Sequence, residues 1–164
     1  MKKILPTLII FIIACFVINT PRKDQRNFNE IFQEEMNYAE FKTYTDPKLG
    51  FSFQYPSFFN NEPCNDGTCN VRFSYHANYI NMVLEVKVTY LKSLCGVYKE
   101  TISSGEVKNY SGYCYHSHSI TYKHCCYMLS FYYPQNYKYA VLRIIRHVNK
   151  WKPYKHRQNL FSLE

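Results

Sequence analysis

A turn followed by an alternating aromatic segment constrains the fold of this chain more than any other feature. Asp46-Pro47 favours a turn because proline fixes φ and aspartate accepts hydrogen bonds from the nearby backbone. Gly50 can end the turn because glycine adopts positive φ without strain. Three aromatic side chains then share one face of a strand: Phe51, Phe53 and Tyr55. Pro56 ends that strand because it lacks an N–H, so the pattern predicts a β-hairpin with residues 41–45 as the partner strand.

The same segment, residues 44–59, resembles the opening signature of the PsbP-like superfamily. The matching residues are Tyr44-Thr45 and Gly50-Phe51-Ser52-Phe53-Gln54-Tyr55-Pro56-Ser57. Members usually have a tryptophan shortly after the Tyr-Pro pair, where this chain has Phe58-Phe59. The superfamily includes a photosystem accessory protein and many exported bacterial proteins of unknown role. The resemblance implies an antiparallel sheet covered by helices and an accessory role in the cell envelope. It assigns no functional residue, because the matching motif is structural.

Length and composition favour a single domain rich in strands. The chain has 164 residues, a length that suits one domain. It contains 17 tyrosines and 12 phenylalanines, and aromatic residues are enriched in strands. The prediction is an α+β domain over residues 28–164, with a mostly antiparallel sheet of about six or seven strands and helices packed on it.

Periodicity places the individual elements. An apolar stripe at helical spacing predicts a helix over 28–39, and polar residues 60–70 are typical of a loop. Residues 91–104 are ambiguous and compatible with a helix. The strands predicted after the hairpin are 71–76, 82–90, 107–115, 120–133 and 139–147, with the connection between 107–115 and 120–133 near 117–119. A C-terminal helix is expected to dock through Trp151, Leu160 and Phe161.

The N-terminus has the composition of a targeting segment. Lys2 and Lys3 precede an apolar run that ends at Ile18, which is short for a full membrane span. The residues Ile12-Ile13-Ala14-Cys15 resemble the bacterial lipoprotein box, in which the cysteine is acylated after export. We therefore predict a signal peptide and lipid-anchor segment over 1–19, lipidation at Cys15, and a polar tether over 20–27. An uncleaved membrane anchor and a plain secreted form are the alternatives.

Export changes the interpretation of the cysteines. Apart from Cys15 there are six: Cys64, Cys69, Cys95, Cys114, Cys125 and Cys126. An even number in an oxidising compartment favours disulfides, although the sequence does not fix their connectivity. Cys64 and Cys69 flank an Asp-Gly turn and are the favoured pair. A bond from Cys114 across a hairpin to Cys125 or Cys126 is a further candidate.

One cluster of residues could instead bind a metal. If residues 114–118 form a strand, Cys114, His116 and His118 point to the same face. Zinc accepts cysteine and histidine ligands in a tetrahedron, and a neighbouring strand could add His124 or Cys126. The spacing matches no standard zinc signature. Disulfides for the cysteines and a solvated strand face for the histidines are therefore the favoured interpretation, and no cofactor is expected, with zinc as the alternative.

Other chemistry has little support in the sequence. There is no Gly-x-Ser-x-Gly motif and no glycine-rich phosphate loop, so we expect no enzymatic activity. The formal net charge is +8, but export argues against nucleic acid as the partner. A basic group near the C-terminus is either a solvated face or a contact for lipid head groups: Arg143, Arg146, His147, Lys150, Lys152, Lys155, His156 and Arg157.

These observations together predict an exported, membrane-attached lipoprotein of the cell envelope that faces the periplasm or the exterior. Its expected role is that of a small non-enzymatic binding or accessory module. The membrane is the expected partner through the N-terminal lipid or anchor, and an envelope protein is a further candidate partner. Two alternatives remain: a zinc-binding protein or metal-dependent enzyme built on Cys114, His116 and His118, and a structural surface protein stapled by disulfides.

Overall fold

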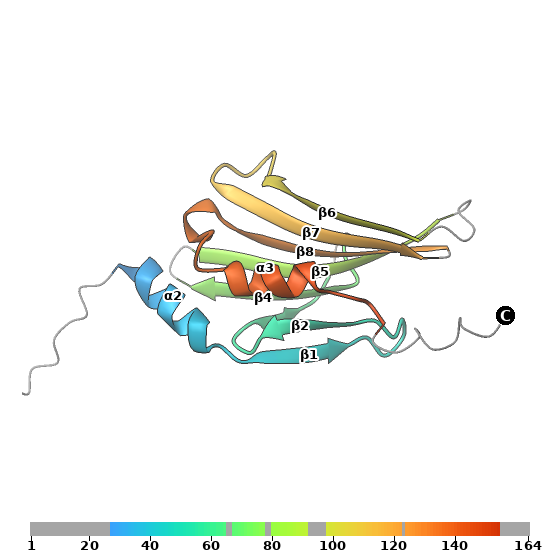
Figure 1. Cartoon of the computed structure of the whole chain (residues 1–164), viewed down its shortest axis with the longest axis horizontal. Helices are drawn as coiled ribbons and strands as arrows, with labels where there is room; N and C mark the ends of the chain where they lie inside the picture. Colours follow the sequence, from blue (N-terminus) through green and yellow to red (C-terminus); the bar gives the residue numbers. More distant parts are fainter. Residues whose placement is uncertain (1–26, 65–66, 78–79, 92–97, 123, 155–164) are drawn as a thin grey trace, which may run out of the picture.

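The computed structural model describes residues 27–64, 67–77, 80–91, 98–122 and 124–154 (Figure 1). Their elements in chain order are α2 (Phe28–Tyr38), β1 (Phe41–Thr45), β2 (Ser52–Pro56), β3 (Asn60–Glu62), β4 (Val71–Ala77), β5 (Ile80–Tyr90), β6 (Lys99–Glu106), β7 (Tyr113–Tyr122), β8 (Cys125–Pro134), the short 3-10 helix η1 (Gln135–Tyr137) and α3 (Leu142–Asn149). Among these described helices, none is long and apolar enough to span a membrane. The interpretations of residues 1–26 and 155–164, including lipidation at Cys15, lie outside the described residues.

The described strands form two antiparallel sheets. Six strands make the larger sheet in the order β3-β4-β5-β8-β7-β6, while β1 and β2 form a separate hairpin. This arrangement confirms the predicted α+β class with a mostly antiparallel sheet. α3 contacts β7 and β8 of the large sheet and β2 of the hairpin. Figure 1 shows α3 lying across the large sheet, so this helix joins the two sheets.

The aromatic hairpin forms as predicted. β1 and β2 pair from Phe41 opposite Pro56 to Thr45 opposite Ser52. The Asp46 carboxylate accepts hydrogen bonds from the backbone N–H groups of the next turn residues, at 2.9 Å from Lys48 and 2.7 Å from Leu49. Gly50 has a φ of 68°, the left-handed conformation for which glycine is favoured.

The core lies between one face of the large sheet and the layer made by the hairpin and the helices. Alternating positions of β5 and β8 contribute the buried side chains Met82, Leu84, Val86, Leu129 and Phe131. Their partners in the same cluster come from α2, the hairpin and α3: Phe32, Met36, Phe51, Phe53, Ile144 and Val148. The alternation in β5 matches the strand predicted over 82–90, and the stripe in α2 matches the helix predicted over 28–39.

The predicted strand over 139–147 is wrong, because the chain forms α3 there. Its β-branched residues favoured a strand. The buried residues of this region recur at helical spacing instead: Tyr137, Ala140, Val141, Ile144, Val148 and Trp151. Burial of this stripe against the sheet outweighs the weak preference of individual residues for extended structure.

The predicted connection near residues 117–119 is also wrong. β7 runs through this segment without a break. Ser117 and Ser130 lie opposite each other in β7 and β8, and their buried hydroxyls form a 2.9 Å hydrogen bond. This bond satisfies polar groups that otherwise favour a turn. In two other places a strand replaces the expected structure: residues 99–106 form β6 where a helix was compatible, and residues 60–62 form β3 inside the predicted loop.

The cysteines confirm one prediction and contradict another. Cys64 and Cys69 form a disulfide with their Cα atoms 5.8 Å apart. Cys114 and Cys125 lie at opposite ends of the β7–β8 pair, roughly 26 Å apart at about 3.3 Å per residue. A bond across the hairpin from Cys114 to Cys125 or Cys126 is therefore excluded, and all three are free cysteines.

Replacing Arg143 with methionine is expected to lower the free energy of unfolding by about 1–2 kcal/mol. The Arg143 guanidinium donates to the carbonyl oxygens of Met36 and Asn37 at the C-terminal end of α2, where helical carbonyls lack partners. The methionine keeps most of the apolar stem. Urea unfolding followed by circular dichroism measures the change. Arg146→Met, on the same helix, is the matched control and should cost less than about 0.5 kcal/mol.

Candidate functional site

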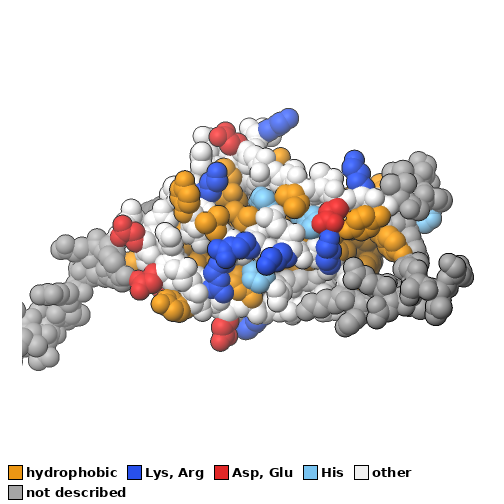
Figure 2. Space-filling view, viewed as in Figure 1, with side chains coloured by type: hydrophobic (Ala, Val, Ile, Leu, Met, Phe, Trp, Pro, Cys, Tyr) orange, Lys and Arg blue, Asp and Glu red, His pale blue; other side chains and the backbone are white. Residues whose placement is uncertain are grey.

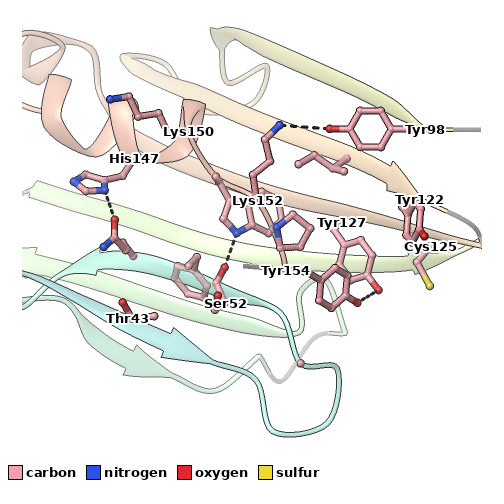
Figure 3. A pocket seen from close by; sticks show the side chains of 16 residues that line it. Thr43, Ser52, Tyr98, Tyr122, Cys125, Tyr127, His147, Lys150, Lys152 and Tyr154 are labelled. Carbon is pink, nitrogen blue, oxygen red and sulfur yellow. Dashed lines mark hydrogen bonds between the residues drawn. The ribbon is translucent and has the colours of Figure 1, made fainter. Parts of the chain in front are cut away.

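A cleft lined mainly by aromatic and aliphatic side chains is the candidate functional site. It has a volume of about 1270 Å³ and lies between the hairpin, the strands β7 and β8, and the segment that follows α3 (Figure 3). Its lining residues are Thr43, Gly50, Ser52, Phe53, Gln54, Tyr98, Ile120, Tyr122, Cys125, Tyr127, His147, Lys150, Trp151, Lys152, Pro153 and Tyr154.

The segment after α3 forms one wall of the cleft because it binds directly to β2. The Trp151 indole Nε1–H donates to the Ser52 carbonyl oxygen at 2.7 Å, and the Ser52 N–H donates to the Pro153 carbonyl oxygen at 3.0 Å. Trp151 is only 5% exposed. Its ring therefore fixes the path of the chain across the hairpin, and its remaining exposed edge faces the cleft.

Two tyrosines lie at the β8 side of the cleft. Figure 3 shows the hydroxyl groups of Tyr127 and Tyr154 pointing toward one another, and they form a hydrogen bond. The Tyr154 hydroxyl also lies 3.4 Å from the Leu49 carbonyl oxygen in the hairpin turn. Burial, and then the hydrogen bond with Tyr154, raise the pKa of the Tyr127 phenol far above its usual range. The Tyr127 phenol is therefore uncharged at neutral pH, and both tyrosine rings line the cleft.

The charged groups of the lining are all cationic. Lys150 and Lys152 line the cleft, whereas no aspartate or glutamate is among the described lining residues. Burial lowers the pKa of His147, and the positive charges of Arg143, Lys150 and Arg146 lower it further. Figure 2 shows several lysine and arginine side chains over the position of α3. Lys152 is paired with Glu100, so the positive charge of the lining lies at Lys150, and the neutral His147 near it donates from Nδ1 to the Gln54 side-chain oxygen at 2.7 Å.

A polar network behind the cleft joins β6 and β7 to the end of α3. His118 is fully buried, with Nδ1 2.8 Å from the Val148 carbonyl oxygen and Nε2 2.8 Å from Oε1 of Glu100. Both partners are acceptors, so the geometry fits an imidazolium that donates from both nitrogens. The second Glu100 oxygen accepts from Lys152 Nζ at 2.7 Å and from the Tyr98 hydroxyl at 2.6 Å.

This network makes the stability of the protein sensitive to acid. The hydrogen bonds from Lys152 and Tyr98 lower the pKa of the Glu100 carboxyl to about 2 from an ordinary value of 4.5. Because the Glu100 pKa is lower in the folded state, its ionised carboxylate stabilises the fold at pH values above the unfolded-state pKa. This stabilisation is lost as the pH falls from about 4.5 to about 2.

The free energy of unfolding should fall less steeply with acid in Glu100→Gln than in the parent between about pH 4.5 and about pH 2. The difference in slope should correspond to at most about one bound proton. Urea midpoints recorded across this interval measure the slope. Glu106→Gln removes an exposed carboxyl from the same strand and is the matched control. Equal slopes for the parent and Glu100→Gln would contradict the role of Glu100.

The proposed zinc ligands are only partly brought together. Cys114, His116 and His118 share one face of β7, as predicted, but the histidines bind the end of α3, with His116 Nε2 2.6 Å from the Asn149 side-chain oxygen. His124 lies in the turn at the far end of β7. Among the described residues, no group of three or more His, Cys, Asp or Glu is placed to hold a metal ion. Zinc binding stays a prediction.

The C-terminal basic group has several different roles. Arg143 binds α2, His147 binds Gln54, and Lys152 binds Glu100, so these three hold the fold together. Arg146 and Lys150 are exposed on α3 and at its end. The other members of the group, residues 155–157, lie outside the described residues. A solvated face therefore accounts for only part of this group.

Sequence reasoning did not find the cleft. It noted the abundance of tyrosine and assigned Trp151 to packing, but it did not place these side chains around a common space. The available signal was the run Trp151-Lys152-Pro153-Tyr154, which combines aromatic rings with a cation directly after a helix.

No family model matches the sequence, and no curated protein is significantly similar to it. The resemblance of residues 44–59 to the PsbP-like superfamily therefore stays a prediction.

Proposed function

We propose that this chain is an exported, lipid-anchored and non-enzymatic binding module of the cell envelope. Its ligand is a small amphipathic organic anion, with one acidic group and an apolar chain or ring. The cleft beside β2 is the observation that carries this proposal, because it combines an aromatic wall with cationic charge.

The lining of the cleft favours a ligand with an apolar part. Small-molecule sites are concave, largely apolar and contain few polar groups. Ile120 and Tyr127 form a buried floor, and Trp151 and Tyr154 form a wall beside them. The volume of about 1270 Å³ is sufficient for a ligand of drug-like size. Burial of an acyl chain here would contribute about 0.8 kcal/mol for each methylene group.

The positive charge of Lys150 favours a ligand with an acidic group. Lys152 is held by Glu100, whereas the Lys150 residue is exposed and its ammonium group has no hydrogen-bond or ion-pair partner among the described residues. Figure 3 shows Lys150 beside His147, at the end of the cleft away from Tyr122. A carboxylate or phosphate can reach this ammonium group while its tail enters the aromatic part. Among the described lining residues there is no carboxylate to repel it.

Calorimetry tests the proposed site with octanoate and octan-1-ol as the matched anionic and neutral probes. The full chain is held in phospholipid nanodiscs, and heats from empty nanodiscs are subtracted to remove partitioning. Octanoate should bind about two- to fivefold more tightly than octan-1-ol, which is the range for one exposed ion pair.

Two lysine variants locate the ion pair. Lys150→Ala should reduce octanoate affinity to that of octan-1-ol, whereas Lys108→Ala, an exposed lysine in the turn between β6 and β7, should leave it unchanged. Binding of neither probe would contradict the proposed site. Equal binding of both probes to the parent protein would contradict the anionic part of the proposal alone.

Attachment to the membrane rests on Cys15 and is tested separately. The mature protein from the membrane fraction should have an intact mass that starts at an acylated Cys15. Cys15→Ser should block this modification and leave the leader in place. A mass that retains Lys2 and Lys3 in the parent protein would contradict lipid attachment and support an uncleaved anchor.

A further inference from the structure

The outer edge of β6 is unpaired in the described part of the chain. β6 is the last strand of the six-stranded sheet, and Figure 1 shows it along one side of the molecule. All of its residues, Lys99 to Glu106, are exposed. Natural edge strands are usually short or protected by charged side chains, proline or bulges. β6 has charged residues only toward its ends, contains no proline and pairs with β7 in an unbroken register.

The hydrogen-bond pattern identifies which backbone groups face outward. The Val107 N–H donates to the Tyr113 carbonyl oxygen at 2.9 Å, immediately after the last paired residue of β6. In an antiparallel pair the residues that bond to the partner alternate along the strand. Because the register is continuous, odd-numbered residues bond to β7. The even-numbered residues direct their N–H and C=O groups outward: Glu100, Ile102, Ser104 and Glu106.

Ile102 is an apolar side chain at the middle of this edge. It lies opposite His118, and residues opposite each other project to the same face, so Ile102 faces the side of the sheet that carries α3. Its exposed fraction is 49%, although an isoleucine in a strand is usually covered. Beside it, Glu100 is held inward by His118 and Lys152. The edge therefore presents a rigid strand with one uncovered apolar side chain.

We propose that β6 pairs in antiparallel orientation with β6 of a second copy of this chain, about a twofold axis at Ile102. This register places the two Ile102 side chains against each other. It also sets Glu100 opposite Ser104 of the second copy and Tyr98, whose hydroxyl lies 3.4 Å from Lys152 Nζ, opposite Glu106 of the second copy. The acidic end of one strand thus approaches a lysine of the other.

Both neighbouring registers are less favourable: an axis at Thr101 would set the Glu100 carboxylate opposite the apolar Ile102 of the second copy, and an axis at Ser103 is disfavoured by charge. An axis at Ser103 would place Glu100 opposite Glu106 of the second copy on both sides of the axis, and like charges directly opposite are destabilising. The axis at Ile102 avoids every such pair. The result is a continuous twelve-stranded sheet, twice the six strands of one copy, with both α3 helices on the same face. This pairing is independent of the proposed ligand.

Cysteine cross-linking in membranes that contain the full chain tests the register. In the proposed dimer the Cα atoms of the two Ile102 residues are about 5.5 Å apart, within the range of about 4.4–6.8 Å that a disulfide spans. Ile102→Cys should therefore give a reducible dimer after mild copper-phenanthroline oxidation. Ser104→Cys, on the same face and edge, places its two copies roughly 13 Å apart along the strand and should not. The parent chain shows the background from Cys114, Cys125 and Cys126.

A charge substitution tests the association itself. Ile102→Lys places two ammonium groups at the axis and should raise the dimer dissociation constant about tenfold or more, as measured by sedimentation of the full chain in nanodiscs. Thr101→Lys, whose side chain projects to the other face, should change it far less. Circular dichroism confirms that both variants are folded. A monomeric parent chain, or equal cross-linking at positions 102 and 104, would overturn the proposal.

Discussion

Replacing Trp151 with alanine is expected to lower the free energy of unfolding by about 3–5 kcal/mol. The indole is 5% exposed and belongs to the central core cluster. Its Nε1–H also donates to Ser52, so the substitution leaves a buried cavity and an unsatisfied carbonyl oxygen. The segment after α3 would lose its principal attachment to the hairpin, and one wall of the cleft would lose its support.

Trp151→Phe separates packing from hydrogen bonding. Phenylalanine retains most of the buried area but removes the bond to Ser52, so this variant should lose about 1–2 kcal/mol. Circular dichroism during urea unfolding is the appropriate measurement, because Trp151 is the only tryptophan and its fluorescence is removed. A loss below about 1 kcal/mol for Trp151→Ala would contradict the assignment of Trp151 as the anchor of this segment.

Replacing His118 with alanine is expected to lower the free energy of unfolding by about 2–4 kcal/mol. The ring is fully buried and bonds to two elements, Val148 at the end of α3 and Glu100 in β6. Its removal leaves a cavity beside Trp151 and takes one hydrogen-bond donor from each of the two acceptors. Bonds to ionised partners are the stronger class of hydrogen bond, so the Glu100 contact should account for much of the loss.

A double-mutant cycle measures how much of this loss comes from the hydrogen bond between His118 and Glu100. Glu100→Ala should cost clearly less in the His118→Ala background than in the parent, because the bond it breaks is already absent. His116→Ala, two residues away on the same face, is the matched control. His116 is only half-buried and makes one hydrogen bond, to the exposed Asn149, so its loss should stay below about 1 kcal/mol. Additive effects of the His118 and Glu100 substitutions would contradict the network.

Local features of the fold could be predicted because their causes lie within a few residues. The turn at Asp46 is stabilised by backbone donors two and three positions later, and Gly50 supplies the positive φ that the turn requires. Cys64 and Cys69 are separated by five positions and form a disulfide. Period-two alternation identified β4 and β5 because one face of each is buried.

Features that depend on long-range packing were less predictable. α3 has the β-branched composition of a strand, and only the sheet beneath it reveals that Ile144 and Val148 form a buried helical stripe. Ser117 resembled a turn residue, but Ser130 satisfies its hydroxyl from the neighbouring strand. In both cases a partner that is distant in sequence decides the local structure.

The cleft could not be predicted for the same reason. Its walls come from three separate parts of the chain, around residues 43–54, 98–127 and 147–154. The bond that closes it, from Trp151 to Ser52, joins positions 99 residues apart. Similarly, the pairing of His118 with Glu100 depends on β6, which the sequence left ambiguous. The cluster of Cys114, His116 and His118 was placed correctly on one face, but its partners in α3 were not foreseen.

The fluorescence of Trp151 tests directly whether the cleft binds an amphipathic anion. It is recorded while 12-bromododecanoate is added to the full chain in nanodiscs. Trp151 is the only tryptophan and lines the cleft, and bromine quenches an indole only at contact. We expect saturable quenching of Trp151 that unbrominated dodecanoate reverses by competition and that Lys150→Ala weakens. Unchanged fluorescence, or non-saturable quenching equal to that of free indole in the same nanodiscs, would contradict a ligand site in the cleft.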